Sequence, residues 1–64
     1  MRTHEGWKKA MDIKQFHSKH KGEKYSEYSK KLSFVEVSME AYYDWSLFVD
    51  DEGNYWVDSF YVGD

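Results

Sequence analysis

The sequence predicts a small α+β domain in which one or two N-terminal helices pack on a three-stranded antiparallel β-meander. Three observations support this. The chain has 64 residues, enough for one domain at most. Apolar residues recur at helical spacing before residue 31 and alternate with polar residues after residue 32. We therefore divide the single domain 1–64 into a basic helical part, 1–31, and an acidic aromatic β-meander, 32–64.

The first helix is expected to begin near Thr3 and to end before Gly22. The Thr3 hydroxyl can accept a backbone N–H at a helix start, and glycine commonly follows a helix end. The residues that share its apolar face, with some drift along the helix, are Trp7, Ala10, Met11, Ile13 and Phe16. Between residues 23 and 31, a short second helix competes with a polar linker.

Three strands are expected after residue 32, because the segments are rich in β-branched and aromatic residues. They are the alternating segment 34–39, then Tyr42–Asp50 and Asn54–Val62. Asp50–Gly53 is predicted to form a type I turn with Gly53 in the left-handed conformation. The first turn, near Met39–Tyr42, has no Gly or Asn, so a helix over 33–48 is an alternative.

Burial of one sheet face selects the predicted register. The second turn places Phe48 opposite Trp56, and the first hairpin keeps its apolar side chains together if Met39 lies opposite Tyr43. The face that the N-terminal helix should then cover consists of Val35, Val37, Met39, Tyr43, Trp45, Leu47, Val49, Tyr55, Val57 and Tyr61.

The opposite face is expected to expose a row of aromatic rings flanked by carboxylates. Its predicted partner-binding residues are Phe34, Glu36, Asp44, Phe48, Trp56, Asp58 and Phe60. Polar residues usually fill the open side of such a sheet, so exposed rings indicate a binding surface. Two alternatives stay open: the N-terminal segment covers this row, or two sheets pack face to face in a homodimer.

Charge divides the chain into two halves. Residues 1–31 contain all nine basic residues against four acidic ones, whereas residues 32–64 contain eight acidic residues and nine of the thirteen aromatic ones. An acidic aromatic surface suits a basic partner, because charges steer association and rings anchor it. We expect a non-catalytic protein–protein interaction module. By analogy with small phage or mobile-element inhibitors, it would occlude a basic or nucleic-acid-binding surface of its target.

The alternative function is direct nucleic-acid binding through the basic half. Its candidate residues are Lys19, Lys21, Lys24, Lys30 and Lys31, interleaved with tyrosines. A solvated helix face, or neutralisation by the acidic sheet, explains the same lysines. The overall net charge of −3 makes this function less favoured than binding to a protein.

Other classes of function have little support. His17, His20 and Glu23 stand at three-residue spacing, but three such ligands without cysteine make a weak zinc site, and we assign no metal or cofactor. The consecutive acids of Asp50–Asn54 do not match a calcium loop. No enzyme site is expected in so short a chain. The absence of cysteine and of an apolar span suits a cytoplasmic protein without a membrane partner.

Overall fold

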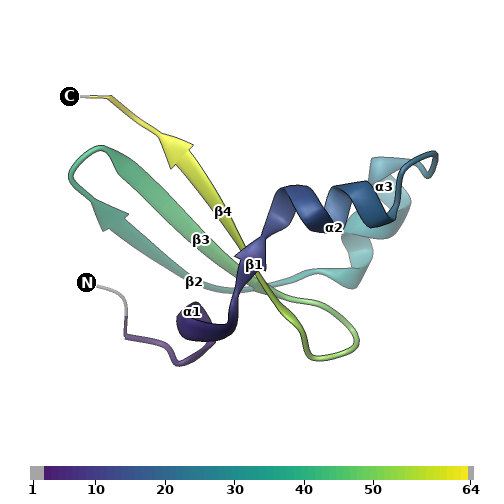
Figure 1. Ribbon diagram of the computed structural model, residues 1–64, viewed down its shortest axis with the longest axis horizontal. Coiled ribbons are helices and arrows are strands. Elements are labelled where there is room, and N and C mark those ends of the chain that lie inside the picture. The colour runs from purple at the N-terminus through teal and green to yellow at the C-terminus, as the bar shows by residue number, and fades with distance from the viewer. Residues whose placement is uncertain (1–2, 64) are drawn as a thin grey trace.

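The computed structural model describes residues 3–63, so Arg2 and Asp64, which contribute to the charge counts, lie outside the described residues. The chain forms an α+β domain with one sheet and short helices (Figure 1). In chain order, its elements are α1 (Gly6–Lys9), β1 (Met11–Asp12), α2 (Ile13–Lys19), α3 (Tyr25–Tyr28), the 3-10 helix η1 (Ser29–Lys31), β2 (Ser33–Glu40), β3 (Tyr43–Val49) and β4 (Tyr55–Tyr61). The helical alternative for 33–48 is therefore wrong.

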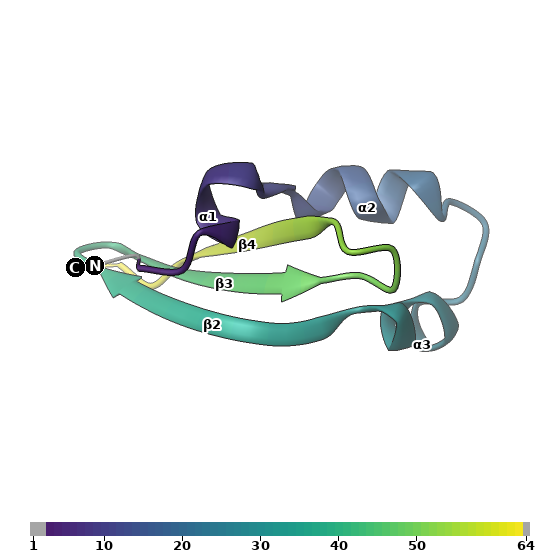
Figure 2. The ribbon, with the colours of Figure 1, turned by 90° about the horizontal axis from the view of Figure 1, so that it is seen from below.

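The sheet has four strands in the order β1-β4-β3-β2. Figure 2 shows β4, β3 and β2 side by side. The predicted antiparallel meander of β2, β3 and β4 is present. The short strand β1 adds a parallel partner to β4, with Met11 beside Trp56 and Asp12 beside Val57, so the sheet is mixed. A strand of two residues carries no alternating pattern, which is why the sequence did not predict it.

The expected long first helix is broken between α1 and α2. Ala10 is extended, with φ −69° and ψ 138°. Asp12 is extended too, and its side chain accepts a 2.9 Å hydrogen bond from the backbone N–H of Lys14, which caps α2. The apparent drift of the apolar face at Ile13 marks this break. The chain crosses the β4 edge there and continues on the opposite face of the sheet.

The α2 and α3 side of the sheet holds the main core. Ile13 and Phe16 from α2 pack with Tyr28 from α3 around Trp56, which is 1% exposed. Phe48 packs against this cluster. The expectation that the N-terminal helix covers the opposite face is therefore incomplete. The alternative that the N-terminal segment covers the aromatic row is confirmed at Trp56 and Phe48.

Helix α1 covers the other face. Its Gly6 lies so close to Tyr55 that an added Cβ would stand 2.7 Å from the ring, which requires glycine at this contact. Trp7 Nε1 donates a 2.9 Å hydrogen bond to Glu36. Leu47 pairs with Glu36 across the strands and is completely buried. The half of the sheet near the β3–β4 turn is thus covered on both faces.

The first hairpin differs from the predicted register by one residue. Glu40 pairs with Tyr43, so the turn has two residues, and Met39 pairs with Asp44 instead of Tyr43. Side chains alternate between faces along a strand. Met39, and Val37 with it, therefore lie on the Trp56 face and not on the expected core face.

A bulge between Phe34 and Glu36 shifts the register back by one residue. Phe34 pairs with Phe48, which pairs with Trp56, so the predicted cross-strand aromatic row is present. The bulge also turns Glu36 to the α1 face, away from this row.

The second hairpin is as predicted. Leu47 pairs with Val57, in the register set by the Asp50–Gly53 turn. Gly53 has φ 85°, a left-handed conformation, and its N–H donates to the Asp50 carbonyl at 3.2 Å. Glycine adopts this conformation at little steric cost, so local chemistry determines this turn.

Candidate functional site

The strand ends near the Glu40–Tyr43 turn expose apolar side chains. Val37, Met39 and Phe60 are 47%, 74% and 67% exposed. Single exposed apolar residues are common on protein surfaces, but adjacent ones mark interaction sites. We call the surface formed by Val37, Met39, Asp44, Asp58 and Phe60 the open sheet patch.

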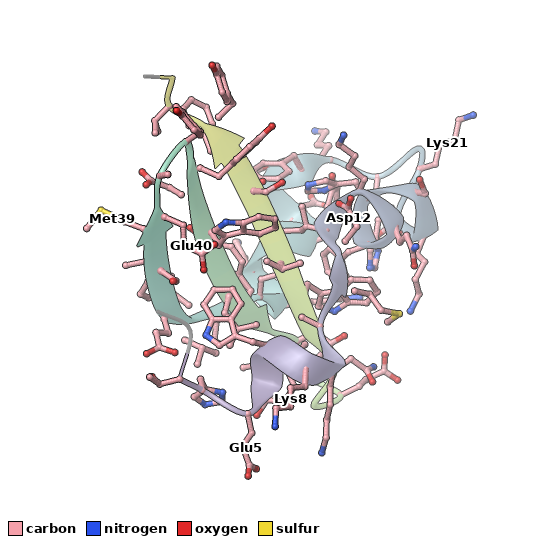
Figure 3. All side chains as sticks on the ribbon, turned by 60° about the vertical axis from the view of Figure 1, so that its left-hand side comes forward. Glu5, Lys8, Asp12, Lys21, Met39 and Glu40 are labelled. Atoms are coloured by element: carbon pink, nitrogen blue, oxygen red, sulfur yellow. The ribbon has the colours of Figure 1, made fainter. Side chains whose placement is uncertain are left out.

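The strand register brings these five residues together on one face. Met39 pairs with Asp44, which pairs with Phe60, giving one row across three strands. Val37 and Asp58 belong to the adjacent row, where both pair with the same residue of β3. Figure 3 shows the Met39 side chain extending away from the sheet. The patch therefore mixes apolar groups with two carboxylates.

The strands add no positive charge to the patch. Asp58 is exposed and Asp44 is half-buried. Residues 32–64 contain no lysine or arginine, so the strands themselves supply no opposing charge. Potentials from exposed carboxylates extend roughly 8 Å at physiological ionic strength. The patch is suited to a ligand that is both apolar and positively charged.

The reverse face of the same strand ends is aromatic. The ring centroid of Tyr43 lies 5.3 Å from that of Tyr61 and 5.9 Å from that of Trp45. Tyr43 and Tyr61 are 43% and 59% exposed, although the sequence assigned both to the covered face. The helices end short of these residues, so both faces of the sheet are open here.

Two of the predicted partner-binding residues belong to the core. Trp56 is buried by α2 and α3, and its Nε1 donates a 3.0 Å hydrogen bond to Asp50. Phe48 is half-buried against the same cluster. The expectation that these rings form an open row is wrong, because the chain's own helices cover them. Phe34 remains 60% exposed at the end of the row, with its ring edge-on to Phe48 at 5.9 Å.

Glu36 lies on the opposite face from the patch and has a structural role. It accepts hydrogen bonds from Trp7 Nε1 at 2.9 Å and from the Thr3 hydroxyl at 3.2 Å. The bond from Trp7 lowers the pKa of Glu36 below its ordinary value, against the opposing effect of partial burial. Glu36 therefore anchors the N-terminal segment to β2, and Thr3 contacts it instead of capping a helix.

Asp50 anchors the β3–β4 turn. Its carboxylate accepts hydrogen bonds from the Trp56 indole and from the backbone N–H groups of Glu52 and Asn54. Burial acts to raise the pKa of Asp50, but these hydrogen bonds outweigh it and hold the pKa below its ordinary value. The acidic turn thus has a structural explanation, and the charged form of Asp50 is favoured.

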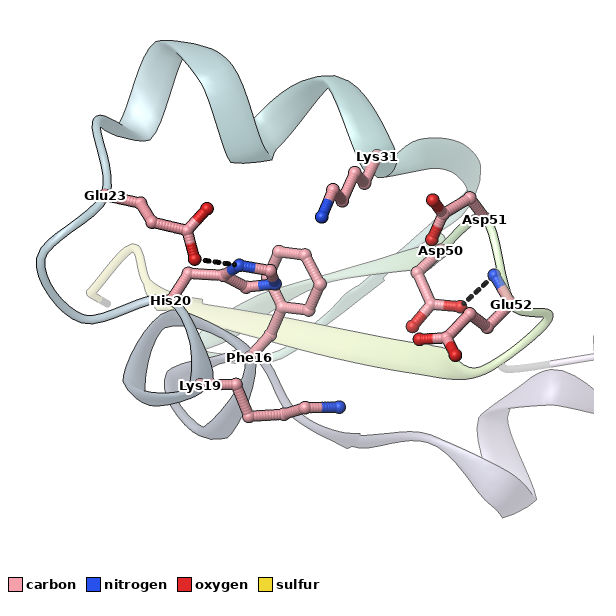
Figure 4. A pocket seen from close by; sticks show the side chains of 8 residues that line it. All are labelled: Phe16, Lys19, His20, Glu23, Lys31, Asp50, Asp51 and Glu52. Atoms are coloured by element: carbon pink, nitrogen blue, oxygen red, sulfur yellow. Dashed lines mark hydrogen bonds and ion pairs between the residues drawn. The ribbon is translucent and has the colours of Figure 1, made fainter.

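A cleft of about 420 Å³ separates this turn from the helices (Figure 4). Its lining residues are Phe16, Lys19, His20, Glu23, Lys31, Asp50, Asp51 and Glu52. Figure 4 shows Lys19 and Lys31 on the helical side and the acids of the turn across from them. Cations and carboxylates therefore face each other across one opening.

This cleft divides the lysines of the predicted nucleic-acid surface. Lys19 and Lys31 line it, and Lys19 Nζ also lies 5.5 Å from the centroid of the Trp56 ring. Lys21, Lys24 and Lys30 are exposed outside it. Three of the five lysines are therefore free of the acidic turn.

His20 lines the cleft and His17 does not, and both contact neighbouring side chains. His17 Nδ1 lies 3.0 Å from the Tyr28 hydroxyl, and His20 Nδ1 lies 2.8 Å from Glu23 Oε2. Within residues 3–63, no three His, Asp or Glu side chains are grouped so that they could hold a metal ion.

Comparisons with known proteins give no relative: no family model, curated protein or solved structure matches this chain. No helix among the described residues is long and apolar enough to cross a membrane. The proposal for function therefore rests on the geometry and charge of the surface.

Proposed function

We propose that this protein is a small non-catalytic protein–protein interaction module that binds a basic target through the open sheet patch. The observation that carries the proposal is the row across the sheet, in which Met39 and Phe60 are 74% and 67% exposed on either side of Asp44. Such a row gives a partner two apolar contacts with a negative charge between them.

The apolar contacts are large enough to support binding. If Val37, Met39 and Phe60 each lose ~80 Å² of apolar surface, the gain is about 6 kcal/mol at ~25 cal/mol per Å². Association itself costs several kcal/mol, so these three residues alone give weak binding. The exposed ring of Phe34, or the aromatic reverse face, would add to it.

The carboxylates of the patch would steer a basic target toward it. Asp44 and Asp58 would attract lysine or arginine on the target and raise the rate of association. In its finer form, the proposal is that the module inhibits its target, with carboxylates standing where nucleic-acid phosphates would bind. This form keeps the analogy with small inhibitors from phages or mobile elements.

Affinity capture from a lysate of the source cells tests the patch. The Met39→Ser/Phe60→Ser double variant should lose a target that the wild type retains, because it removes the two apolar contacts. Tyr25→Ser is the matched control, since Tyr25 is 62% exposed but lies on α3. A captured set that is identical for all three proteins would contradict the proposal.

The captured target then tests the charges. Asp44→Lys and Asp58→Lys should slow association most strongly at low salt, because long-range attraction is screened by ions. Association rates that are unchanged in both variants would reject the role of these carboxylates.

Nucleic-acid binding is the second candidate, favoured by the exposure of Lys21, Lys24 and Lys30. A fluorescence titration with DNA and with RNA at two salt concentrations tests it. Binding that weakens steeply with salt would support phosphate contacts by these lysines. A lack of binding at the lower salt concentration would reject this function.

A further inference from the structure

The chain has no cysteine, so its sulfur chemistry depends on three methionines. Two of them lie among the described residues, and they differ in exposure. Met39 is 74% exposed near the end of β2, whereas Met11 is 41% exposed and lies in β1 beside the buried Trp56. Met39 therefore has the more accessible thioether of these two.

The surroundings of Met39 make its side chain part of the surface alone. The side chain extends away from the sheet (Figure 3), and the buried cluster around Trp56 does not include it. Its cross-strand neighbour is Asp44, a residue of the open sheet patch. A chemical change at this sulfur would therefore alter the patch and leave the core as it is.

A peroxide can make such a change. The Met39 sulfur attacks one oxygen of hydrogen peroxide, so that an S–O bond forms while the O–O bond breaks. The sulfur is oxidised by two electrons, and the proton of the transferred oxygen goes to the leaving hydroxide to give water. The product is a sulfoxide, which is polar where the thioether was apolar. Burying it against an apolar contact costs free energy.

The charge of the patch favours an uncharged oxidant. Asp58 is exposed and Asp44 is half-buried beside Met39. These carboxylates would repel an anionic oxidant, whereas hydrogen peroxide is neutral and approaches without that cost. A peroxide is therefore the class of oxidant that suits this site.

We propose that Met39 is a redox-sensitive contact of the open sheet patch, which a peroxide converts from apolar to polar by forming the sulfoxide. The regulatory part of this inference rests on the proposed function, because it concerns the target that the patch binds. Met39 is one of three exposed apolar residues there, and the loss of ~80 Å² of apolar contact corresponds to about thirtyfold in affinity. Reductases convert the sulfoxide back to the thioether, so the change is reversible.

Peroxide treatment of the purified protein tests the site without any target. Peptide mass spectrometry over time should show that Met39 gains an oxygen several times faster than Met11. Retention on a hydrophobic interaction column should fall for the wild type but not for Met39→Leu, which has no sulfur at this position. Equal oxidation rates of the two methionines, or a fall in retention that Met39→Leu shares, would overturn the proposal.

Thermal unfolding separates a surface change from a structural one. Protein oxidised at Met39 and not yet at Met11 should unfold at the same temperature as untreated protein. A clearly lower unfolding temperature would show that Met39 supports the fold, which contradicts its placement outside the core.

A target captured through the patch tests the regulatory part. Oxidised wild type, freed of peroxide, should bind the target at least tenfold more weakly, and a methionine sulfoxide reductase should restore the affinity. Met39→Gln, whose amide oxygen resembles the sulfoxide in polarity, should bind weakly without any oxidant. The affinity of Met39→Leu should be the same before and after treatment. Wild-type binding that oxidation leaves unchanged would reject this regulation.

The two proposals fail in different ways. If no target depends on the patch, the proposed function fails and the regulatory part fails with it, while the oxidation rates of the purified protein still decide the chemistry at Met39. If a target depends on the patch but binds the oxidised protein equally well, the proposed function stands and the regulatory part alone is wrong.

Discussion

Trp56 and Phe60 show how differently the two halves of the sheet are covered. Both are large aromatic residues on the same face of β4, four positions apart, yet one is 1% exposed and the other 67%. The reason is length: a seven-residue helix such as α2 extends about 10 Å, whereas a seven-residue strand extends about 23 Å. The helices cannot cover the whole sheet, so position along the strand decides which ring is core.

The largest expected effect comes from alanine substitution of Trp56, compared with the same substitution of Phe60. Trp56→Ala should lower the free energy of unfolding by about 3–5 kcal/mol, because it leaves a cavity under α2 and removes a hydrogen bond to Asp50. Phe60→Ala should change it by less than about 0.5 kcal/mol. Urea denaturation followed by circular dichroism measures both. Similar losses for the two variants would show that the far half is covered after all.

A smaller effect is expected at the turn that closes the covered half. Asp50→Asn should lower the free energy of unfolding by about 1–3 kcal/mol, because the carboxylate is buried and accepts several hydrogen bonds. Asp51→Asn, an exposed neighbour, is the matched control and should have little effect.

The same pair of variants gives a pH dependence. The pKa of Asp50 is lower in the folded chain than its ordinary value of 3.8, so its charged form stabilises the fold. That contribution is complete well above pH 3.8 and is lost as pH falls through this value toward the lower folded pKa. Stability of the wild type should therefore decline more steeply below about pH 5 than that of Asp50→Asn. Parallel curves would contradict the role of Asp50.

The smallest expected effect is an increase in the free energy of unfolding. It concerns Ser38, between the covered and the open half of the sheet. Ser38 is 5% exposed, and its hydroxyl oxygen has no hydrogen-bond partner among the described residues. Ser38→Ala removes this unsatisfied group and should raise the free energy of unfolding by up to about 1 kcal/mol. Thermal unfolding is sensitive enough to detect it, and a clear loss of stability would reveal a partner for the hydroxyl.

The second hairpin could be predicted from sequence because local chemistry determines it. Gly53 allows the left-handed residue of the turn, and the turn then fixes which residues of β3 and β4 pair. The first hairpin has no such residue at its turn. Its two-residue turn and the bulge after Phe34 depend on packing against the rest of the sheet, so the predicted register was wrong by one residue.

This one-residue error in register explains why the sequence analysis did not place Val37 and Met39 in the candidate site. It moved Val37 and Met39 from the expected core to the open sheet patch, beside the predicted residues Asp44, Asp58 and Phe60. The other error came from the helices. The drift of the apolar pattern at Ile13 was the available signal that the N-terminal segment serves both faces, and Trp56 and Phe48 became core as a result.

The pairing of β1 with β4 also bears on how the chain folds during synthesis. Met11 lies beside Trp56, so contacts made by the first strand wait for residues made 45 positions later. Non-local contacts of this kind slow folding, because a long loop must close before they form. The core around Trp56 can close only after translation has passed β4, and until then α2 can contact α3 but not the sheet.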